Sequence, residues 1–258
     1  MNLIARGAWE REELVHNQGQ TRSVRKQSHL LHTPDTFIRT QLPGSEKTVV
    51  VVHVSPALGA AFTQYTAEFE TGGVLGPALG QRFVYVLEGE VEVEAGGESH
   101  NLCKDGYIYL PGGVQHTCRS TNGARAAVIE KRYVSVTGAK PPEVLVGHEP
   151  DVAGQPLMGD EDLLVRGLLP DTFAFDFAVN TMIYEPGAAL SMVEIHVMEH
   201  GLLMLEGGGI YRLDESWYPV TAGDFIWMAP YCPQWFGALG KTPAKYLIYK
   251  DWNRHPLG

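Results

Sequence analysis

The chain has 258 residues, of which 44% are hydrophobic and 19% charged, as in a globular protein with one large domain or two smaller ones. No apolar run approaches the roughly 20 residues that a membrane span needs, and residues 1–10 lack the apolar stretch of a secretory signal, so we expect a cytoplasmic protein that makes no contact with membranes. Thirty acidic against 20 basic residues give a net charge of -10, which argues against nucleic acid as a partner.

Short segments rich in β-branched and aromatic residues, each bounded by Gly, Pro or Asp, predict β-strands throughout the first half of the chain. They comprise residues 49–53, 64–70, 83–87, 91–95, 107–110 and 126–133. The 29 glycines and 16 prolines of the chain punctuate many such segments, which is typical of an all-β sandwich or barrel.

The middle of the chain, residues 134–170, contains five prolines and little alternation of polar and apolar residues. We expect a structured crossover there, with one short helix at residues 160–164. The strand-like pattern then returns in residues 173–184, 202–205, 209–213, 225–228 and 245–249.

An internal repeat relates the two halves. With a shift of 118 residues, residues 83–116 align with 201–234, and Leu87-Glu88-Gly89 falls on Leu205-Glu206-Gly207. The sequence therefore predicts two tandem antiparallel barrels that arose by duplication. We place the N-terminal barrel in residues 1–140, the crossover linker in 141–169 and the C-terminal barrel in 170–258.

The three cysteines, Cys103, Cys118 and Cys232, are an odd number without CxxC spacing. This indicates neither a disulfide framework nor a thiolate metal site. We expect each to be a small buried apolar residue, with a reactive thiol as the alternative.

The pattern with the most chemical content is Glu194-x-His196-x-x-x-His200, followed by Gln234. A straight strand would separate the two histidines by about 13 Å, too far to share an ion, so the chain must turn between them. A turn at residues 199–201 would place His200 beside His196, with Gln234 supplied by a distant strand. Two imidazoles and two oxygen donors suit a divalent ion such as Mn, Fe, Co or Ni.

The alternative is that the histidines are chance neighbours on the surface. The repeat favours the metal site, because it assigns this segment one defined place in a β unit. The equivalent N-terminal positions hold Gly76, Ala78 and Arg82, and only His116 resembles a ligand. We therefore expect one metal site, in the C-terminal barrel, and a degenerate N-terminal site.

These motifs resemble those of the cupin superfamily, with its double-stranded β-helix, or jelly-roll, barrels. The pattern of candidate ligands has a glutamate in the first position, a histidine in the third and a glutamine at the end. It is similar to the pattern of one bicupin family, the (S)-ureidoglycine aminohydrolases of purine (allantoin) degradation. The resemblance extends over residues 31–44, 55–65, 130–138, 194–201 and 249–254.

The resemblance implies a Mn2+ ion held by Glu194, His196, His200 and Gln234. It also implies substrate contacts from Tyr211, Tyr246 and Lys250, all of which are present. Tyr246 and Lys250 lie four residues apart and share a face if their strand continues. Without the resemblance, we would interpret Lys250 as a solvated cation at a strand end. We would interpret the two tyrosines as aromatic side chains that fill the barrel interior.

Two further polar residues, Asp176 and Asn180, lie in one predicted strand and would point to the same side. They would either line the pocket or sit on a solvated face.

The implied reaction converts (S)-ureidoglycine and water to (S)-ureidoglycolate and ammonia. Glu194, as a ligand with a free second oxygen, would carry the proton, and Lys250 would anchor the small anionic ureido substrate. An Fe(II) dioxygenase and a non-enzymatic metabolite-binding bicupin stay open as alternatives, since the fold alone does not decide the function. We also expect a homo-oligomer.

Overall fold

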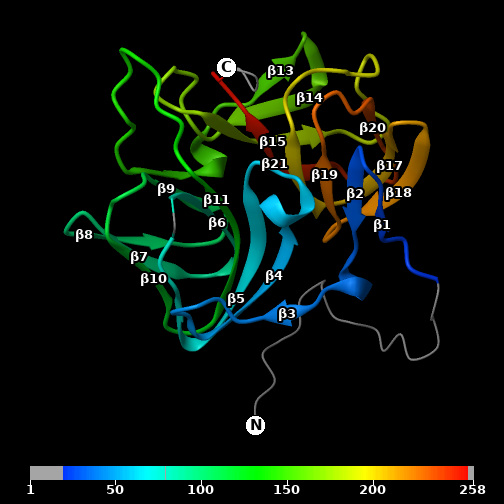
Figure 1. Cartoon of the computed structure of the whole chain (residues 1–258). Helices are drawn as coiled ribbons and strands as arrows, with labels where there is room; N and C mark the ends of the chain where they lie inside the picture. Colours follow the sequence, from blue (N-terminus) through cyan, green and yellow to red (C-terminus); the bar gives the residue numbers. More distant parts are fainter. Residues whose placement is uncertain (1–19, 79, 255–258) are drawn as a thin grey trace.

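The structure is a computed structural model that describes residues 20–78 and 80–254. Two β-barrels lie side by side (Figure 1), as the sequence predicts. Helical structure in the described residues is limited to three single 3-10 turns, and none of these could span a membrane. They are η1 (Pro34–Thr36), η2 (Pro56–Leu58) and η3 (Glu149–Asp151). The expectation for residues 1–10 falls outside the described part.

The N-terminal barrel is built from ten strands, of which six overlap the predicted segments and four, at residues 39–40, 98–102, 116–120 and 145–148, were not predicted. They are β3 (Arg39–Thr40), β4 (Glu46–Val54), β5 (Thr63–Leu75), β6 (Gln81–Gly89), β7 (Val91–Ala95), β8 (Glu98–Leu102), β9 (Gly106–Leu110), β10 (His116–Ser120), β11 (Ala124–Lys131) and β12 (Leu145–His148). In the sheet the order is β12-β9-β6-β11-β5-β10-β7-β8, and β4 pairs with both β5 and β3.

The C-terminal barrel uses the remaining strands. They are β1 (Val24–Arg25), β2 (His29–His32), β13 (Gln155–Leu157), β14 (Asp160–Gly167), β15 (Phe177–Tyr184), β16 (His200–Glu206), β17 (Gly208–Leu213), β18 (Ser216–Thr221), β19 (Phe225–Met228), β20 (Gln234–Ala238) and β21 (Ala244–Asp251). One sheet has the order β1-β2-β19-β16-β21-β15-β14-β13, and the other has the order β18-β17-β20.

Corresponding strands of the two halves pair in the same order, which confirms the duplication. The path β12-β9-β6-β11-β5 in the first barrel matches β2-β19-β16-β21-β15 in the second. Gly89 and Gly207, which the repeat aligns, both adopt the left-handed backbone conformation, with φ of 74° and 63°. A Cβ on either would stand 2.4 Å from a neighbouring backbone oxygen, so only glycine fits.

The two barrels exchange strands across the boundaries that we predicted. Strand β2, from the first part of the chain, pairs with β19 of the C-terminal barrel, and β12, from the linker, pairs with β9 of the N-terminal barrel. Each barrel is therefore completed by a segment that lies outside its own repeat. The predicted boundaries at residues 140 and 170 separate the two repeats along the sequence. They do not separate the two barrels, because each barrel contains strands from the other side of a boundary.

The helix predicted at residues 160–164 is wrong. Residues 160–167 form strand β14, which pairs with both β13 and β15. Its register against β15 buries Leu163 in the C-terminal core, so pairing in the sheet outweighs local propensity here.

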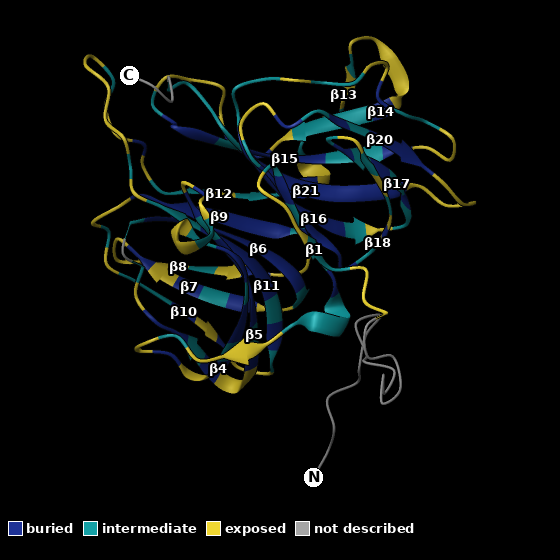
Figure 2. Ribbon diagram, turned by 45° about the vertical axis from the view of Figure 1, so that its right-hand side comes forward, coloured by how far each residue is buried: buried dark blue, intermediate teal, exposed yellow. Residues whose placement is uncertain are grey.

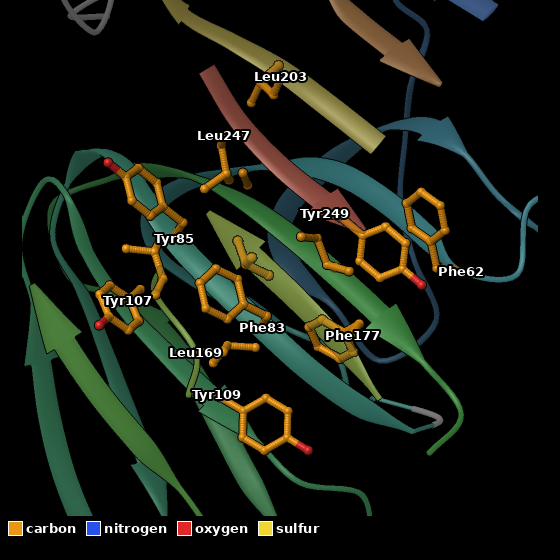
Figure 3. Packing of buried hydrophobic residues seen from close by; sticks show 14 of the residues in the cluster. Phe62, Phe83, Tyr85, Tyr107, Tyr109, Leu169, Phe177, Leu203, Leu247 and Tyr249 are labelled. Carbon is orange, nitrogen blue, oxygen red and sulfur yellow. The ribbon is translucent and has the colours of Figure 1, made fainter. Parts of the chain in front are cut away.

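The apolar side chains gather in three clusters. Two fill the barrel interiors, and the third, the inter-barrel cluster, joins the outer faces of both barrels. In Figure 2 the strands that meet between the barrels are almost entirely buried. Figure 3 shows this cluster, in which Phe83 and Tyr109 of the first barrel meet Phe177 and Tyr249 of the second.

The cysteines are all free. Cys118 and Cys232 are buried as expected, but the expectation for Cys103 is wrong because this residue is exposed. It begins the turn between β8 and β9, where its carbonyl accepts a hydrogen bond from the Gly106 amide.

A buried ion cluster connects the linker to the C-terminal barrel. The carboxylate of Glu149, 1% exposed, accepts hydrogen bonds from Lys245 Nζ at 2.6 Å, Arg166 Nη1 at 2.5 Å and Thr181 Oγ1 at 3.0 Å. Burial acts to raise the pKa of Glu149, but these hydrogen bonds and the Lys245 charge outweigh it, so the pKa lies below its ordinary value of 4.5.

We predict that Glu149→Gln lowers the free energy of unfolding by about 3 kcal/mol at neutral pH, because two cations then lose their carboxylate. Since the folded-state pKa is depressed, the contribution of Glu149 is complete above pH 4.5 and is lost as the pH falls through the lower value. The difference in unfolding free energy between wild type and Glu149→Gln, measured by urea denaturation, should therefore become smaller in acid. The exposed linker variant Glu143→Gln serves as the control. A difference that stays constant with pH would contradict this account.

Candidate active site

The segment between β15 and β16 carries the first two predicted metal ligands. Glu194 forms an isolated antiparallel bridge with Gln234, in which Glu194 N donates to Gln234 O at 2.8 Å and Gln234 N donates to Glu194 O at 3.0 Å. The carbonyl of His196 then accepts a hydrogen bond from Tyr231 N at 2.7 Å. The chain turns after His196, and β16 begins at His200. The chain does turn between the two histidines, as predicted, but the bend lies at Val197 and not at residues 199–201, because His200 and Gly201 already belong to β16.

This turn brings the two imidazoles together. The Nε2 atoms of His196 and His200 are 3.2 Å apart, and their rings cross at 76°. The side-chain amide of Gln234, at the start of β20, lies 2.7 Å from His196 Nε2. Three side chains from three separate segments therefore converge, as the sequence predicts.

Hydrogen bonding defines the tautomer of His200. Its Nδ1 lies 3.3 Å from the carbonyl oxygen of Tyr249 and so donates its proton there. Burial, followed by the charges of His196 and Lys250, lowers the pKa of His200 to about 3. The ring is neutral at pH 7, and its Nε2 lone pair is directed at His196. A neutral imidazole with its second nitrogen bound to a carbonyl is the form in which histidine ligates metals.

The arrangement fits a divalent ion in part. Two ligand atoms at about 2.1 Å from an octahedral ion lie about 3 Å apart, which agrees with the 3.2 Å between the Nε2 atoms of His196 and His200. The Gln234 atom nearest to His196 is its amide nitrogen, so the amide must turn before its oxygen can be a ligand. The buried His196 Nδ1 has no hydrogen-bond partner among the described residues. Among the residues that the structure describes, no three His, Cys, Asp or Glu side chains lie close enough together to hold a metal. Glu194 therefore does not join the two histidines as a third ligand in this conformation.

The backbone nonetheless places Glu194 beside the other donors. Residues opposite each other in an antiparallel bridge have Cβ atoms about 5 Å apart on one face, so Glu194 and Gln234 point the same way. The Glu194 charge also acts on Lys250, Tyr211 and Tyr246. The bridge therefore puts the Glu194 side chain on the same face as the Gln234 amide.

Lys250 lies next to the histidine pair. It is the cross-strand neighbour of His200 on β16 and of Ala178 on β15. The oxygen of the Asn180 amide, oriented so that its NH2 group donates to Val179 O, accepts from Lys250 Nζ at 3.1 Å, and the ring of Trp252 lies 4.9 Å from the same atom. Burial lowers the pKa of Lys250, against the opposing charge of Glu194. Lys250 is therefore a held cation within the site.

Tyr211 and Tyr246 lie in the interior of the C-terminal barrel, and each is only 1% exposed. Tyr246 and Lys250 are both in β21 and share a face, as predicted. The Tyr246 hydroxyl lies 2.7 Å from that of Tyr184. Burial raises the pKa of Tyr211 and of Tyr246 well above 10, so both stay neutral phenols that can donate hydrogen bonds.

The expectation that Asp176 and Asn180 lie in one strand is wrong, because β15 begins at Phe177. Asp176 is fully buried and accepts hydrogen bonds from Gln81 Nε2 at 2.7 Å and Lys131 Nζ at 3.1 Å, so it joins the two barrels. Asn180 alone lies at the site, beside Lys250.

The equivalent site of the N-terminal barrel contains an arginine side chain. The guanidinium of Arg82, 1% exposed, donates to Glu130 Oε1 at 2.7 and 2.9 Å, to Gly76 O at 2.8 Å and lies 3.0 Å from His116 Nε2. Gly76, Arg82 and His116 are the counterparts of Glu194, His200 and Gln234. A permanent cation is thus held by the residues that correspond to the predicted metal ligands.

Residues that the sequence did not single out complete the C-terminal site. Tyr184 bonds to Tyr246, and Trp252 covers Lys250. The sequence signal that could have identified Trp252 as a site residue is its position two residues after Lys250. Tyr184 gave none, because its contact to β21 depends on the pairing of distant strands.

We predict that Arg82→Met lowers the free energy of unfolding by about 3–5 kcal/mol, because the partly buried Glu130 then loses its charged partner. Urea denaturation measures the loss. Arg119→Met, on the exposed side of β10, is the matched control and should change stability by less than about 0.5 kcal/mol. A similarly small effect for Arg82→Met would show that the ion pair is dispensable.

Comparison with known proteins agrees with this architecture. Residues 66–130 and 180–249 match the Cupin domain family. The chain is 42% identical to the (S)-ureidoglycine aminohydrolase of Arabidopsis thaliana over 93% of this chain and 80% of that protein. It is 31% identical to the (S)-ureidoglycine aminohydrolase of Escherichia coli (strain K12) over 95% of both chains. The crystal structure of protein Ylba from E. coli superposes with a TM-score of 0.82 at 29% identity, covering 95% of this chain and 98% of that one. The chain therefore belongs to the (S)-ureidoglycine aminohydrolase family of bicupin proteins.

Proposed function

We propose that this protein is a Mn2+-dependent hydrolase that converts (S)-ureidoglycine and water to (S)-ureidoglycolate and ammonia. The observation that carries the proposal is the convergence of His196, His200 and Gln234 next to the half-buried cation Lys250. The names of the curated relatives support the choice of substrate.

In this proposal, His196, His200, Gln234 and a rotated Glu194 hold the metal. A bound Mn2+ would act as a Lewis acid and as a template that orients the substrate. Two neutral nitrogen donors with amide and carboxylate oxygens are a set that suits Mn2+ and excludes soft thiolate-seeking metals.

The substrate would be held by the cationic end of β21. Lys250 forms a charge-assisted hydrogen bond with the substrate carboxylate, and its contacts with Asn180 and Trp252 fix the ammonium in place. The neutral phenols of Tyr211 and Tyr246 donate to the carbonyl of the ureido group. This combination selects a small anion with a polar neutral end.

Glu194 would carry the proton. In the net reaction the C–N bond to the amine breaks, a C–O bond to water forms, and a proton passes from water to the departing amine. The charge of Glu194 raises the pKa of Lys250 and of both tyrosines, which supports a role for its carboxylate beside the groups that would hold the substrate. One carboxylate can take the proton from water and deliver it to the amine.

The setting that goes with this activity is the degradation of purines through allantoin, in the cytoplasm, by a homo-oligomer. The net charge of -10 is consistent with an enzyme of small metabolites that binds neither nucleic acid nor membranes.

The direct test is ammonia release from freshly generated (S)-ureidoglycine by the Mn2+-loaded protein, with the chirality of the product analysed. We expect one Mn2+ per chain and the (S) product. His196→Ala should lose both the metal and the activity while its thermal unfolding stays cooperative, because the barrel core does not depend on one ion. A protein that binds Mn2+ but releases no ammonia would be a metabolite-binding bicupin instead.

A second prediction concerns the role of Lys250. Lys250→Met should retain Mn2+ and lower kcat/KM by about 10–150-fold, the value of one charge-assisted hydrogen bond. A substrate analogue with a neutral amide in place of the carboxylate should show a much smaller difference between wild type and variant. Equal losses for both substrates would mean that Lys250 supports the fold or carries a proton.

A further inference from the structure

The N-terminal barrel touches the C-terminal barrel directly behind His200. Residues 61–64, which lead into β5 and include its first two residues, lie against the residues on either side of this histidine and against β21. Figure 3 shows Phe62 beside Tyr249 at this place in the inter-barrel cluster. Three separate contacts are made there. Each involves a residue that either neighbours His200 in the chain or accepts a hydrogen bond from its ring.

The first contact fixes Glu199, which precedes His200. Glu199 is 2% exposed, and its Oε1 accepts a hydrogen bond from the Ala61 backbone amide at 2.7 Å. Its Oε2 accepts from Trp227 Nε1 at 3.0 Å. Both carboxylate oxygens are thus used, one by the N-terminal barrel and one by β19. The side chain cannot rotate without leaving a buried N–H group unpaired.

The second contact fixes Tyr249, the residue whose carbonyl accepts the Nδ1 proton of His200. The rings of Phe62 and Tyr249 stack with centroids 3.9 Å apart and an angle of 26° between them. The Tyr249 hydroxyl also donates to Asp251 Oδ1 at 2.6 Å. The carbonyl that defines the tautomer of His200 therefore belongs to a residue held from the N-terminal barrel.

The third contact lies at Gly201, which follows His200. A Cβ at this position would stand 2.3 Å from Gln64 Oε1 and 2.6 Å from the Phe62 ring. The N-terminal side chains are therefore packed against the bare backbone of β16. Because the residues before and after His200 are both fixed in this way, its Cα position and ring direction are set from the N-terminal barrel.

We propose that residues 61–64 of the N-terminal barrel are the support that orients His200, with Glu199 and Phe62 as positioning residues. The proposal rests on the metal site of the proposed function. A ligand that is held in advance loses less entropy when it binds an ion, and contacts behind a ligand commonly change metal affinity by 10–100-fold. The degenerate barrel would then serve the active site without binding a metal itself.

The test compares Glu199→Gln, just before β16, with Glu206→Gln at the exposed far end of β16. Glutamine has the shape of glutamate but offers an NH2 group to one of two N–H donors, so one of the two bonds to Glu199 is lost. We expect the dissociation constant for Mn2+, measured by titration calorimetry, to rise about 10–100-fold in Glu199→Gln and to stay unchanged in Glu206→Gln. Phe62→Leu, which removes the stacking but keeps an apolar side chain, should weaken Mn2+ binding in the same direction.

A second readout does not depend on metal or activity. Imidazole 1H–15N spectra of the metal-free proteins report the tautomer of His200, which should be the Nδ1–H form in the wild type and a mixture in Glu199→Gln and Phe62→Leu. Unchanged Mn2+ affinity and an unchanged tautomer in both variants, with only a lower melting temperature, would overturn the proposal. If wild-type protein binds Mn2+ without releasing ammonia, the proposed activity fails and the affinities still decide this inference. If wild type binds no Mn2+, the tautomer decides it.

Discussion

The burial of one sheet face of each barrel against the other is the constraint on which the rest of the structure depends. The aromatic side chains of the inter-barrel cluster point outward from strands whose opposite faces line the barrel interiors. Neither barrel could leave this face in water, because it would expose a large apolar patch of Phe, Tyr and Trp side chains. The strands that carry His200 and Lys250 are therefore buried on both faces, which explains why they consist of nearly continuous apolar runs.

Polar groups buried in and around this interface give it a single geometry. Asp176 is held by Gln81 and Lys131 of the N-terminal barrel, and Glu199 is held by Ala61 of the same barrel. Glu149 ties the linker to the C-terminal barrel through Lys245. Apolar contacts tolerate sliding, whereas a buried carboxylate without its donors is costly, so these three groups select one docking of the barrels. The strand exchange through β2 and β12 adds covalent continuity to the same arrangement.

The two barrels carry different residues at the equivalent position near the barrel centre. In the N-terminal barrel the Gly76 carbonyl, the Glu130 carboxylate and the His116 ring surround one position, and their lone pairs need a positive partner. The N-terminal barrel supplies its own cation, the Arg82 guanidinium, balanced by Glu130. The C-terminal barrel has His200 in the corresponding place, and in the proposed function the lone pair on its Nε2 ligates an ion that comes from solution. All four aligned positions differ between the two barrels, and the replacement of Arg82 by His200 removes the built-in cation.

Much of this protein was determined by the sequence alone. Strands could be recognised from short apolar alternation between glycines, and the duplication from the repeated Leu-Glu-Gly turn, because Gly89 and Gly207 satisfy a local backbone requirement. The spacing of His196 and His200 required a turn for a similar reason, since strand geometry is fixed. Only the tertiary structure decided the rest. The register of β14 overrode its helical appearance, the barrels exchanged strands, and Tyr184, Asp176 and Glu199 found partners up to 138 residues away. Such partners depend on which surfaces are buried together, and no local pattern of residues records that.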